Sequence, residues 1–190
     1  MANTYFSAVY NRFLNKITDD MYIELTPEDT VKDLQNLLID ALPGFEFPRC
    51  NLYDYKIEVV AIDEGEVEDD DFILGNVWGD LSIENASQVI VDKSHFETEL
   101  TPEEINILAI IMKQGWVQRQ VTSIEQTRMK YTGTDFKHSS QANHLSKLLS
   151  LLDKSKQDSI HMQRLYKRRR PTKQGYVSNW SCLRDTSALD

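Results

Sequence analysis

The chain has 190 residues, of which 41% are hydrophobic and 27% are charged, and its formal net charge is −9. This composition fits one globular domain with a core, and no run of about 18 apolar residues is present to span a bilayer. The first residues lack the basic and then apolar layout of a signal peptide, so we expect a soluble protein made in the cytoplasm. Only two cysteines occur, Cys50 and Cys182, which argues against a disulfide framework and a zinc site.

Charge is divided unevenly between the two halves of the chain. Residues 1–100 hold 22 acidic and 6 basic residues, a net charge of −16, whereas residues 101–190 hold 8 acidic and 15 basic residues, a net charge of +7. Such a division gives the molecule a directional field, which orients neighbouring molecules or a polyanion. We therefore expect a function in assembly.

Two amphipathic helices are predicted near the N-terminus. Apolar residues recur at three- and four-residue steps from Phe6 to Ile17, which predicts a first helix that ends near residues 19–20. A second helix is predicted to begin at Thr26, whose hydroxyl caps it, and to stop at residues 43–44, the pair Pro-Gly.

Three β-rich runs follow, at residues 55–62, 72–78 and 89–91, and predict a small antiparallel sheet inserted at residues 53–93. Residues 63–71, which join the first two runs, contain seven acidic residues and are expected to form a hairpin tip. Their spacing does not match an EF-hand. Two interpretations remain open, a solvated tip and a functional acidic surface, with the candidate residues Glu66, Glu68, Asp69, Asp70 and Asp71.

A third helix is predicted from Thr101, which forms a capping box with Glu104, to Trp116, and its nearly all-round apolar surface predicts a central position in the core. A separate short segment at residues 124–131 and a break at residues 132–134 are expected to follow. The longest helix is then predicted from residue 139 or 140 to residue 169.

This last helix would be on the order of 45 Å long. Its first half has a stripe of leucines and is expected to pack, whereas its second half keeps few apolar residues and is expected to project from the body.

The projecting end carries a basic cluster, Lys-Arg-Arg-Arg at residues 167–170. Three interpretations are open: favourable charge at a helix C-terminus with added solubility, docking to a partner, or direct binding of DNA. Residues 171–190 have no periodic pattern but contain Tyr176, Trp180 and Leu183. This composition predicts an extended arm that orders on a partner, and the alternative is a tail that folds back on its own domain.

The chain shows no signature of catalysis. It has neither a glycine-rich phosphate loop nor a Gly-x-Ser-x-Gly motif. Its four histidines lack the spacing of known metal sites, so we expect no catalytic residue, no cofactor and no metal. These histidines are His95, His138, His144 and His161.

Two stretches resemble a known family. They are FETELTPEEINILAIIMKQGWVQRQV at residues 96–121 and DFKHSSQANHLSKLLSLLDKSKQDS at residues 135–159. An acidic-capped apolar helix that ends in Trp, a short helix, a polar junction and a long charged helix resemble the connector proteins of tailed bacteriophages, also called adaptor or neck proteins. The resemblance covers residues 96–166 and, loosely, the N-terminal helices. The inserted sheet and the C-terminal arm depart from the simplest members of that family.

The resemblance implies a non-enzymatic virion protein in the neck, between head and tail. Such proteins form a ring, often of twelve copies, that docks beneath the portal protein and offers a platform to a stopper or tail protein. DNA passes through the ring without sequence-specific binding. The long helix and the arm would then reach the portal, with the expected interface residues Tyr166, Lys167, Arg168, Arg169, Arg170, Tyr176, Trp180 and Leu183.

We thus predict a mainly α fold: a helical connector domain at residues 1–170, with the inserted sheet, and an extended arm at residues 171–190. In the ring, the acidic residues would either line the channel and repel DNA or meet the basic half of the next subunit. Two other functions remain as alternatives. One is a DNA-packaging protein of the terminase small-subunit type, and the other is a small regulatory phage protein directed at the host.

Overall fold

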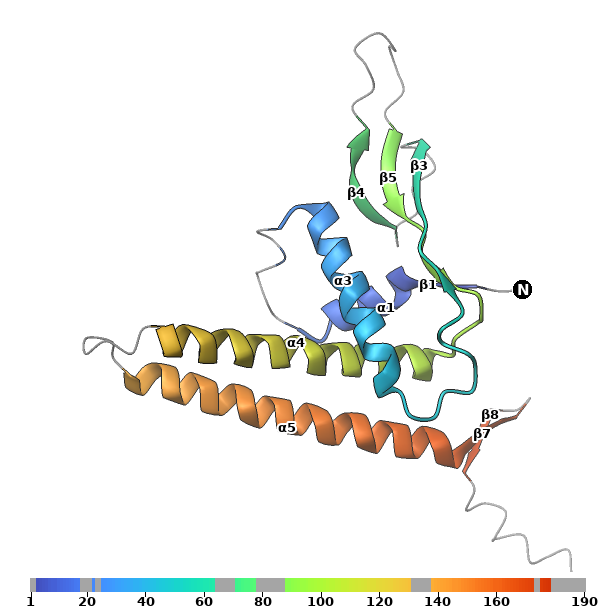
Figure 1. Cartoon of the computed structure of the whole chain (residues 1–190). Coiled ribbons are helices and arrows are strands. Elements are labelled where there is room, and N and C mark those ends of the chain that lie inside the picture. The colour runs from blue at the N-terminus through green and yellow to red at the C-terminus, as the bar shows by residue number, and fades with distance from the viewer. Residues whose placement is uncertain are drawn as a thin grey trace, which may run out of the picture.

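The structure is a computed structural model that describes residues 3–17, 22, 25–63, 71–77, 88–130, 138–172 and 175–178. Within these residues the fold is mainly α with small antiparallel sheets, as the sequence predicts. Two long helices lie side by side, two shorter helices lie across one of them, and a three-stranded sheet stands at the far side of the shorter helices (Figure 1).

The two long helices are α4 (Pro102–Lys130) and α5 (His138–Arg168), of 29 and 31 residues. The prediction of a helix that stops near Trp116, with a separate segment after it, is wrong, because α4 continues without a break. Val117 and Val121 are buried one turn apart and extend the apolar face, so tertiary packing sustains the helix where the sequence pattern weakens.

Both helix starts predicted from a Thr-Pro sequence are confirmed. Helix α3 (Pro27–Ala41) is capped by Thr26, whose Oγ1 accepts a hydrogen bond of 3.2 Å from the Asp29 N–H. At α4 the capping box is complete: the Glu104 N–H donates to Thr101 Oγ1 at 3.3 Å, and the Thr101 N–H donates to Glu104 Oε2 at 2.7 Å. These contacts satisfy N–H groups that a helix start otherwise leaves without a partner.

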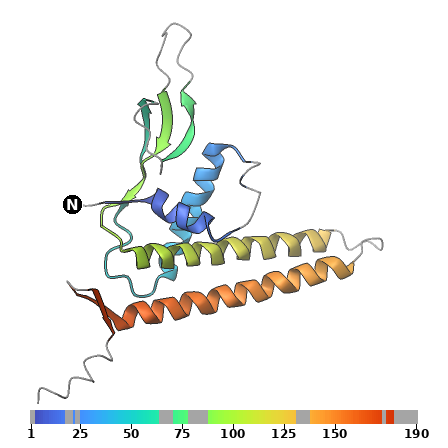
Figure 2. The same cartoon turned by 180° about the vertical axis from the view of Figure 1, so that it is seen from behind.

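Helices α1 (Phe6–Leu14) and α3 pack on α4, with α3 followed by the short 3-10 helix η1 (Leu42–Gly44). Helix α1 ends several residues earlier than predicted. Figures 1 and 2 show both helices over the half of α4 that is nearer its N-terminus, while the other end of the α4–α5 pair extends beyond them. The largest fully buried side chains of this core are Phe6, Tyr10, Phe13, Leu34, Leu37, Leu38, Leu52, Phe96, Ile107, Leu108, Met112 and Tyr166.

Six strands form two three-stranded antiparallel sheets among the described residues, and one of these strands, β1, precedes α1. The first has the order β1-β6-β2 and consists of β1 (Thr4–Tyr5), β6 (His95–Phe96) and β2 (Tyr55–Lys56). The second has the order β3-β5-β4 and consists of β3 (Val59–Asp63), β5 (Gln88–Asp92) and β4 (Phe72–Val77). A two-stranded ribbon of β7 (Arg169–Thr172) and β8 (Gly175–Ser178) follows α5 directly.

The topology corrects the prediction of an acidic hairpin. Strands β3 and β4 both pair with β5 and lie on opposite sides of it, so residues 64–70 connect the two edges of the sheet and not two paired strands. The hairpin of this sheet is the β4–β5 connection. The second and third β-rich runs match β4 and β5, whereas the first run, residues 55–62, is divided between β2 and β3, which belong to different sheets. Strand order depends on pairing between distant residues, which alternation alone does not encode.

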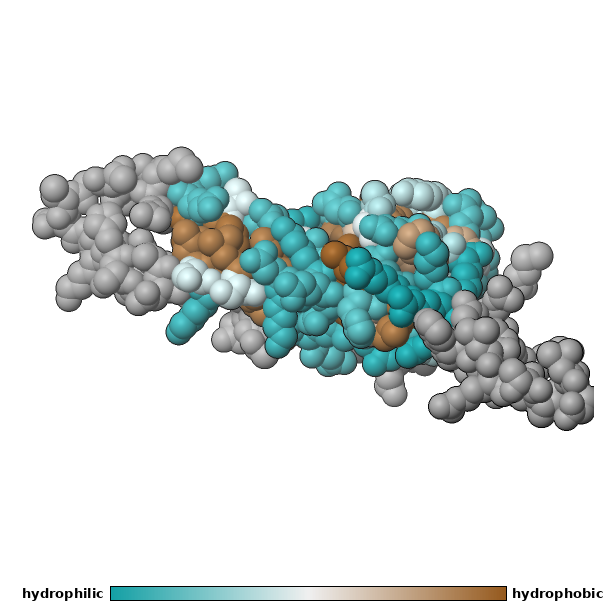
Figure 3. Space-filling view, turned by 90° about the horizontal axis from the view of Figure 1, so that it is seen from below, coloured by the Kyte–Doolittle hydropathy of each residue, from teal (hydrophilic) through white to brown (hydrophobic). Residues whose placement is uncertain are grey.

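The structure contradicts the expectation that the C-terminal half of α5 projects from the body, whereas the N-terminal half packs along α4 as expected. The C-terminal half lies against the body, with Tyr166 only 1% exposed. The N-terminal half, with its leucine stripe, lies along the part of α4 that extends beyond α1 and α3. Figure 3 shows hydrophobic surface at that end, where Leu149 is 42% exposed. The basic cluster therefore starts at the body of the molecule and not at a projecting tip.

Candidate partner-docking site

The loop after η1 is attached to the C-terminal half of α5 by one amide side chain. Gln163 is buried, its Nε2 donates to the Gly44 carbonyl at 3.0 Å, and its Oε1 accepts from the Glu46 N–H at 2.9 Å. Since both functions of the amide are used, the side chain satisfies two backbone groups of a loop that forms no regular structure. The loop is thereby held in one position on the helix.

Tyr166 completes this attachment from inside the body. Its hydroxyl donates to Glu104 Oε1, its ring packs edge-on against Phe45, and the Arg49 guanidinium lies 4.2 Å from the ring centroid. Burial, and then the hydrogen bond to Glu104, raise the pKa of Tyr166 above its ordinary value. The expectation that Tyr166 faces a partner is wrong for this conformation, because the side chain is part of the core.

The end of α5 is capped by the loop and by α4. Arg49 Nη2 donates to the Tyr166 carbonyl at 2.9 Å and also to the Arg169 carbonyl, and such contacts satisfy acceptors that a helix end leaves open. The Arg169 side chain forms a 2.8 Å ion pair with Glu103, which is 10% exposed. One of the four cations of the basic cluster is therefore neutralised within the chain.

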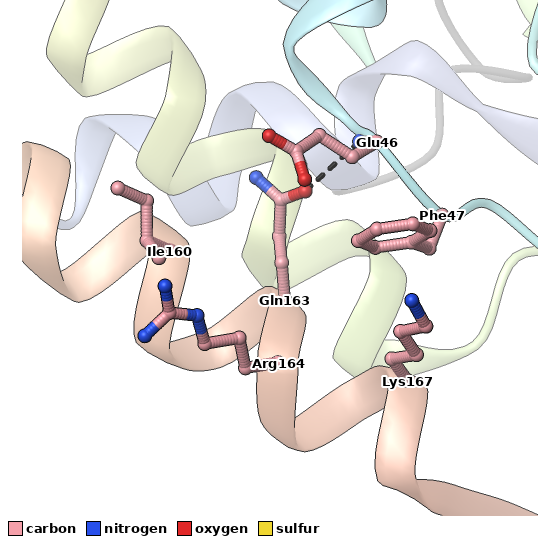
Figure 4. Close-up of a pocket in the computed structure, with 6 residues that line it drawn as sticks. All are labelled: Glu46, Phe47, Ile160, Gln163, Arg164 and Lys167. Atoms are coloured by element: carbon pink, nitrogen blue, oxygen red, sulfur yellow. Dashed lines mark hydrogen bonds between the residues drawn. The ribbon is translucent and has the colours of Figure 1, made fainter.

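Beside this attachment lies a pocket of about 310 Å³, which we call the docking groove and define by its lining residues, Glu46, Phe47, Ile160, Gln163, Arg164 and Lys167. Figure 4 shows the loop residues Glu46 and Phe47 on one side of the groove and the α5 residues on the other, with the side chain of Gln163 reaching from α5 to the loop.

The groove presents apolar surface to solvent. Phe47 is 38% exposed and Ile160 is 47% exposed. The Lys167 ammonium lies 3.9 Å from the centroid of the Phe47 ring, a cation–π contact, and Figure 4 shows it pointing at that ring. Arg164 and Arg168 are exposed, and among the described residues neither forms an ion pair. The groove thus combines exposed apolar side chains with two cations, Arg164 and Lys167, and one carboxylate, Glu46.

For the other residues of the predicted interface, the structure describes the backbone only or nothing at all. Arg170 lies in β7 and Tyr176 in β8, where the structure describes the backbone pairing but not these side chains. Trp180 and Leu183 lie outside the described residues.

Of the predicted acidic surface, only Asp71 belongs to the described residues, whereas Glu66, Glu68, Asp69 and Asp70 lie outside them. The Asp71 carboxylate accepts two hydrogen bonds from Lys93 Nζ, at 2.7 and 2.8 Å, and its side chain is 8% exposed. Asp71 is therefore a paired structural residue, and its inclusion in a free acidic surface was wrong.

Sequence reasoning missed the loop side of the groove. Phe47 and Arg49 sit in the sequence Phe-Glu-Phe-Pro-Arg at residues 45–49, which shows no periodicity and was not assigned a role. A hydrophobic residue next to a proline in a loop was the available signal, but nothing local indicates that this loop meets a helix more than 110 positions away.

No group of three or more His, Cys, Asp or Glu side chains in the described part of the chain is arranged to hold a metal ion. None of the described helices is both long and apolar enough to cross a membrane. Burial raises the pKa of the Cys50 thiol, which lowers its thiolate fraction and hence its nucleophilicity.

Comparisons of the chain with protein-family models, with curated proteins and with solved structures find no match.

Proposed function

We propose that the chain is a structural subunit of a bacteriophage head–tail connector. It forms an oligomeric ring, often of twelve copies in the family that it resembles, which docks beneath the portal protein of the DNA-filled head, surrounds the DNA channel and receives a stopper or tail protein. The stretch that carries the resemblance, residues 96–166, folds largely as the α4–α5 pair.

The observation that carries the proposal is the docking groove. Exposed Phe47 and Ile160 lie beside Arg164, whose charge has no partner among the described residues, and the groove rests on a rigidly attached loop. Exposed apolar side chains within a charged rim are typical of protein–protein contacts, where a few anchors supply most of the binding energy. Such a surface fits a subunit whose task is to hold a neighbour.

The layout of charge also supports an assembly role. Residues 1–100, with a net charge of −16, include the sheet at the top of Figure 1, whereas the net charge of residues 101–190, which include α5, is +7. A subunit whose two sequence halves differ in charge orients its neighbours and disfavours contacts between like-charged parts.

The DNA-packaging alternative is less well supported by the basic cluster. Arg169 is paired with Glu103 and Lys167 covers the Phe47 ring, so fewer cations are free for phosphates than the sequence count indicates. Each phosphate contact contributes to the affinity and to its salt dependence, so a small number of free cations predicts weak binding to duplex DNA.

The test is to mix the purified chain with portal protein and to measure mass and ring symmetry by native mass spectrometry and electron microscopy. Arg164→Glu with Lys167→Glu should weaken portal binding by at least about tenfold, because two favourable charges become repulsive. The matched control is Lys154→Glu, an exposed cation of α5 outside the groove, which should leave binding nearly unchanged.

Two outcomes would contradict the proposal. A chain that stays monomeric and does not bind portal is not a connector subunit. A chain that instead binds duplex DNA at moderate salt, with an affinity that falls steeply as salt rises, belongs to the terminase small-subunit type.

A further inference from the structure

Residues 54–63 form one extended segment that runs through both three-stranded sheets. It contains β2 and β3 and pairs with the chain of β5 and β6 in a single register, without an inserted residue. Two backbone hydrogen bonds outside the strands continue this register: the Glu97 N–H donates to the Asp54 carbonyl at 2.9 Å, and the Lys93 N–H donates to the Glu58 carbonyl at 2.9 Å. At about 3.3 Å per residue, the segment is roughly 33 Å long.

The outer edge of this segment has no strand beside it among the described residues. Both β2 and β3 are end strands of their sheets, and Figure 1 shows β3 on the side of β5 that faces away from β4. In an antiparallel ladder, backbone groups point alternately to the two sides. The carbonyls of Asp54 and Glu58 point inward. The N–H and C=O groups of the odd-numbered positions Tyr55, Ile57 and Val59 therefore point outward.

This edge is exposed and partly apolar. Ile57 is 54% exposed and Val59 is 53% exposed, and residues 54–63 contain neither proline nor glycine. A long edge with open backbone groups and apolar side chains is a template for a strand from another molecule. Strand addition at such an edge is a common mode of protein–protein recognition.

The charges along the edge are self-complementary. Lys56 and Glu58 stand on either side of Ile57, and both are exposed. When a second copy pairs antiparallel about Ile57, Lys56 of each copy faces Glu58 of the other, and the two-fold axis supplies this contact twice. Opposite charges directly across a strand pair stabilise it. Glu58 has no ion pair among the described residues, and the Lys56 side chain stays 65% exposed beside its own Glu97.

We infer that the chain associates with a second copy through residues 55–59, in an antiparallel strand pair centred on Ile57. The pair satisfies the outward backbone groups of both copies and removes part of the Ile57 and Val59 side chains from water. A second copy fits better than an unrelated peptide, because both members of the charge pair belong to the same edge. The inference concerns the chain alone and does not rest on the proposed function.

The first experiment measures the dimer of the full chain by analytical ultracentrifugation. Glu58→Lys should weaken it by at least about tenfold, because the introduced lysine faces Lys56 of the second copy at two equivalent places. Lys56→Glu should weaken it similarly, since two carboxylates then face each other. Glu125→Lys, at an exposed position of α4, is the matched control and should leave the dimer unchanged. Circular dichroism verifies that each variant is folded.

Mixing the two edge variants gives the sharpest test. In an equimolar mixture each lysine faces a carboxylate again, so dimer formation should recover to within about threefold of the original chain. An unspecific effect of either substitution would not be corrected by mixing. A mixture that stays as weak as the separate variants would overturn the inference, and so would an original chain that remains monomeric.

The second experiment tests the register by disulfide formation with oxidised glutathione, in a chain that carries Cys50→Ser and Cys182→Ser. Ile57→Cys should form a disulfide between two copies, since paired residues lie about 5.5 Å apart. Val59→Cys is the matched control, because in this register its two copies lie about 13 Å apart and should react at least about tenfold more slowly. Equal rates would overturn the inference. Portal is absent from both experiments, so neither result depends on whether the chain is a connector.

Discussion

The two halves of α5 differ in burial. The N-terminal half (residues 138–152) carries the leucine stripe, but Leu149 is 42% exposed. The C-terminal half (residues 153–168) is rich in polar residues, but Gln163 and Tyr166 are buried. The difference lies in what surrounds each half. The loop after η1 packs on the C-terminal half, and α1 and α3 lie over the adjoining part of α4. The N-terminal half lies along the other end of α4, which α1 and α3 do not cover.

The contrast shows that apolar content alone does not decide which part of a helix is buried. In the C-terminal half the buried face contains Ser155, Ser159 and Gln163. Serines are small enough to let helices approach closely, and Gln163 is buried at low cost because it hydrogen bonds to the loop backbone. In the N-terminal half Leu152 is buried, whereas the leucines before it are partly or largely exposed, because no further element covers them among the described residues.

The largest effect should come from Tyr166. Replacing Tyr166 with Ala removes a fully buried aromatic ring and should lower the free energy of unfolding by about 3 to 5 kcal/mol. Leu149→Ala, the matched control in the other half, should cost less than about 1 kcal/mol, because much of that side chain is already in water. Urea denaturation followed by circular dichroism measures both. Similar losses for the two variants would remove the contrast between the halves.

A smaller effect is expected at Gln163. Gln163→Ala leaves the Gly44 carbonyl and the Glu46 N–H without their partner and should cost about 1 to 3 kcal/mol. Gln157→Ala, at an exposed position of the same helix, should change stability by no more than about 0.5 kcal/mol. Hydrogen exchange should also become faster at the Glu46 amide in the first variant only. An unchanged Glu46 exchange rate would show that the amide contacts do not hold the loop.

Two glycines, Gly44 at the end of η1 and Gly115 in α4, offer a further test of packing near the C-terminal half of α5. A Cβ at Gly44 would lie 2.9 Å from Ile111 Cγ2, so Gly44→Ala should destabilise the protein by about 1 to 2 kcal/mol. Gly115→Ala should instead stabilise it by about 0.5 to 1 kcal/mol, since nothing lies within 4 Å of the added methyl and alanine favours the helix. Thermal melts compare the two. Ile111→Leu, which removes the branching Cγ2, should restore part of the loss at Gly44, and a failure to do so would locate the strain elsewhere.

The smallest effect is a dependence on alkaline pH. The pKa of Tyr166 is raised in the folded state, so its contribution to stability is complete below the ordinary tyrosine pKa of about 10 and is lost as the pH rises above that value. Between pH 8 and 10.5 this loss should be less than about 1 kcal/mol for one tyrosine. Tyr166→Phe should reduce the slope of stability against pH in this range. An identical slope in the variant would mean that Tyr166 is not the group responsible.

Several features were predictable from local patterns. Thr26 and Thr101 each begin a helix because their hydroxyls accept from N–H groups within the same turn. The long C-terminal helix, the strands β4 and β5 and the mainly α class were also predicted correctly, since each depends on the period of apolar residues within a short window. The continuous α4 was missed, because burial of Val117 and Val121 sustains it where the pattern fades.

The sequence by itself determined where α3 and α4 begin, the position of α5 and the separation of charge, because capping, periodicity and composition are properties of neighbouring residues. Only the tertiary structure decided that β5 lies between β3 and β4, that Tyr166 is buried against Glu104, and that Phe47 and Ile160 line one groove. Each of these contacts joins residues far apart in the chain, and its energy depends on how whole elements pack. No local pattern of residues contains that information.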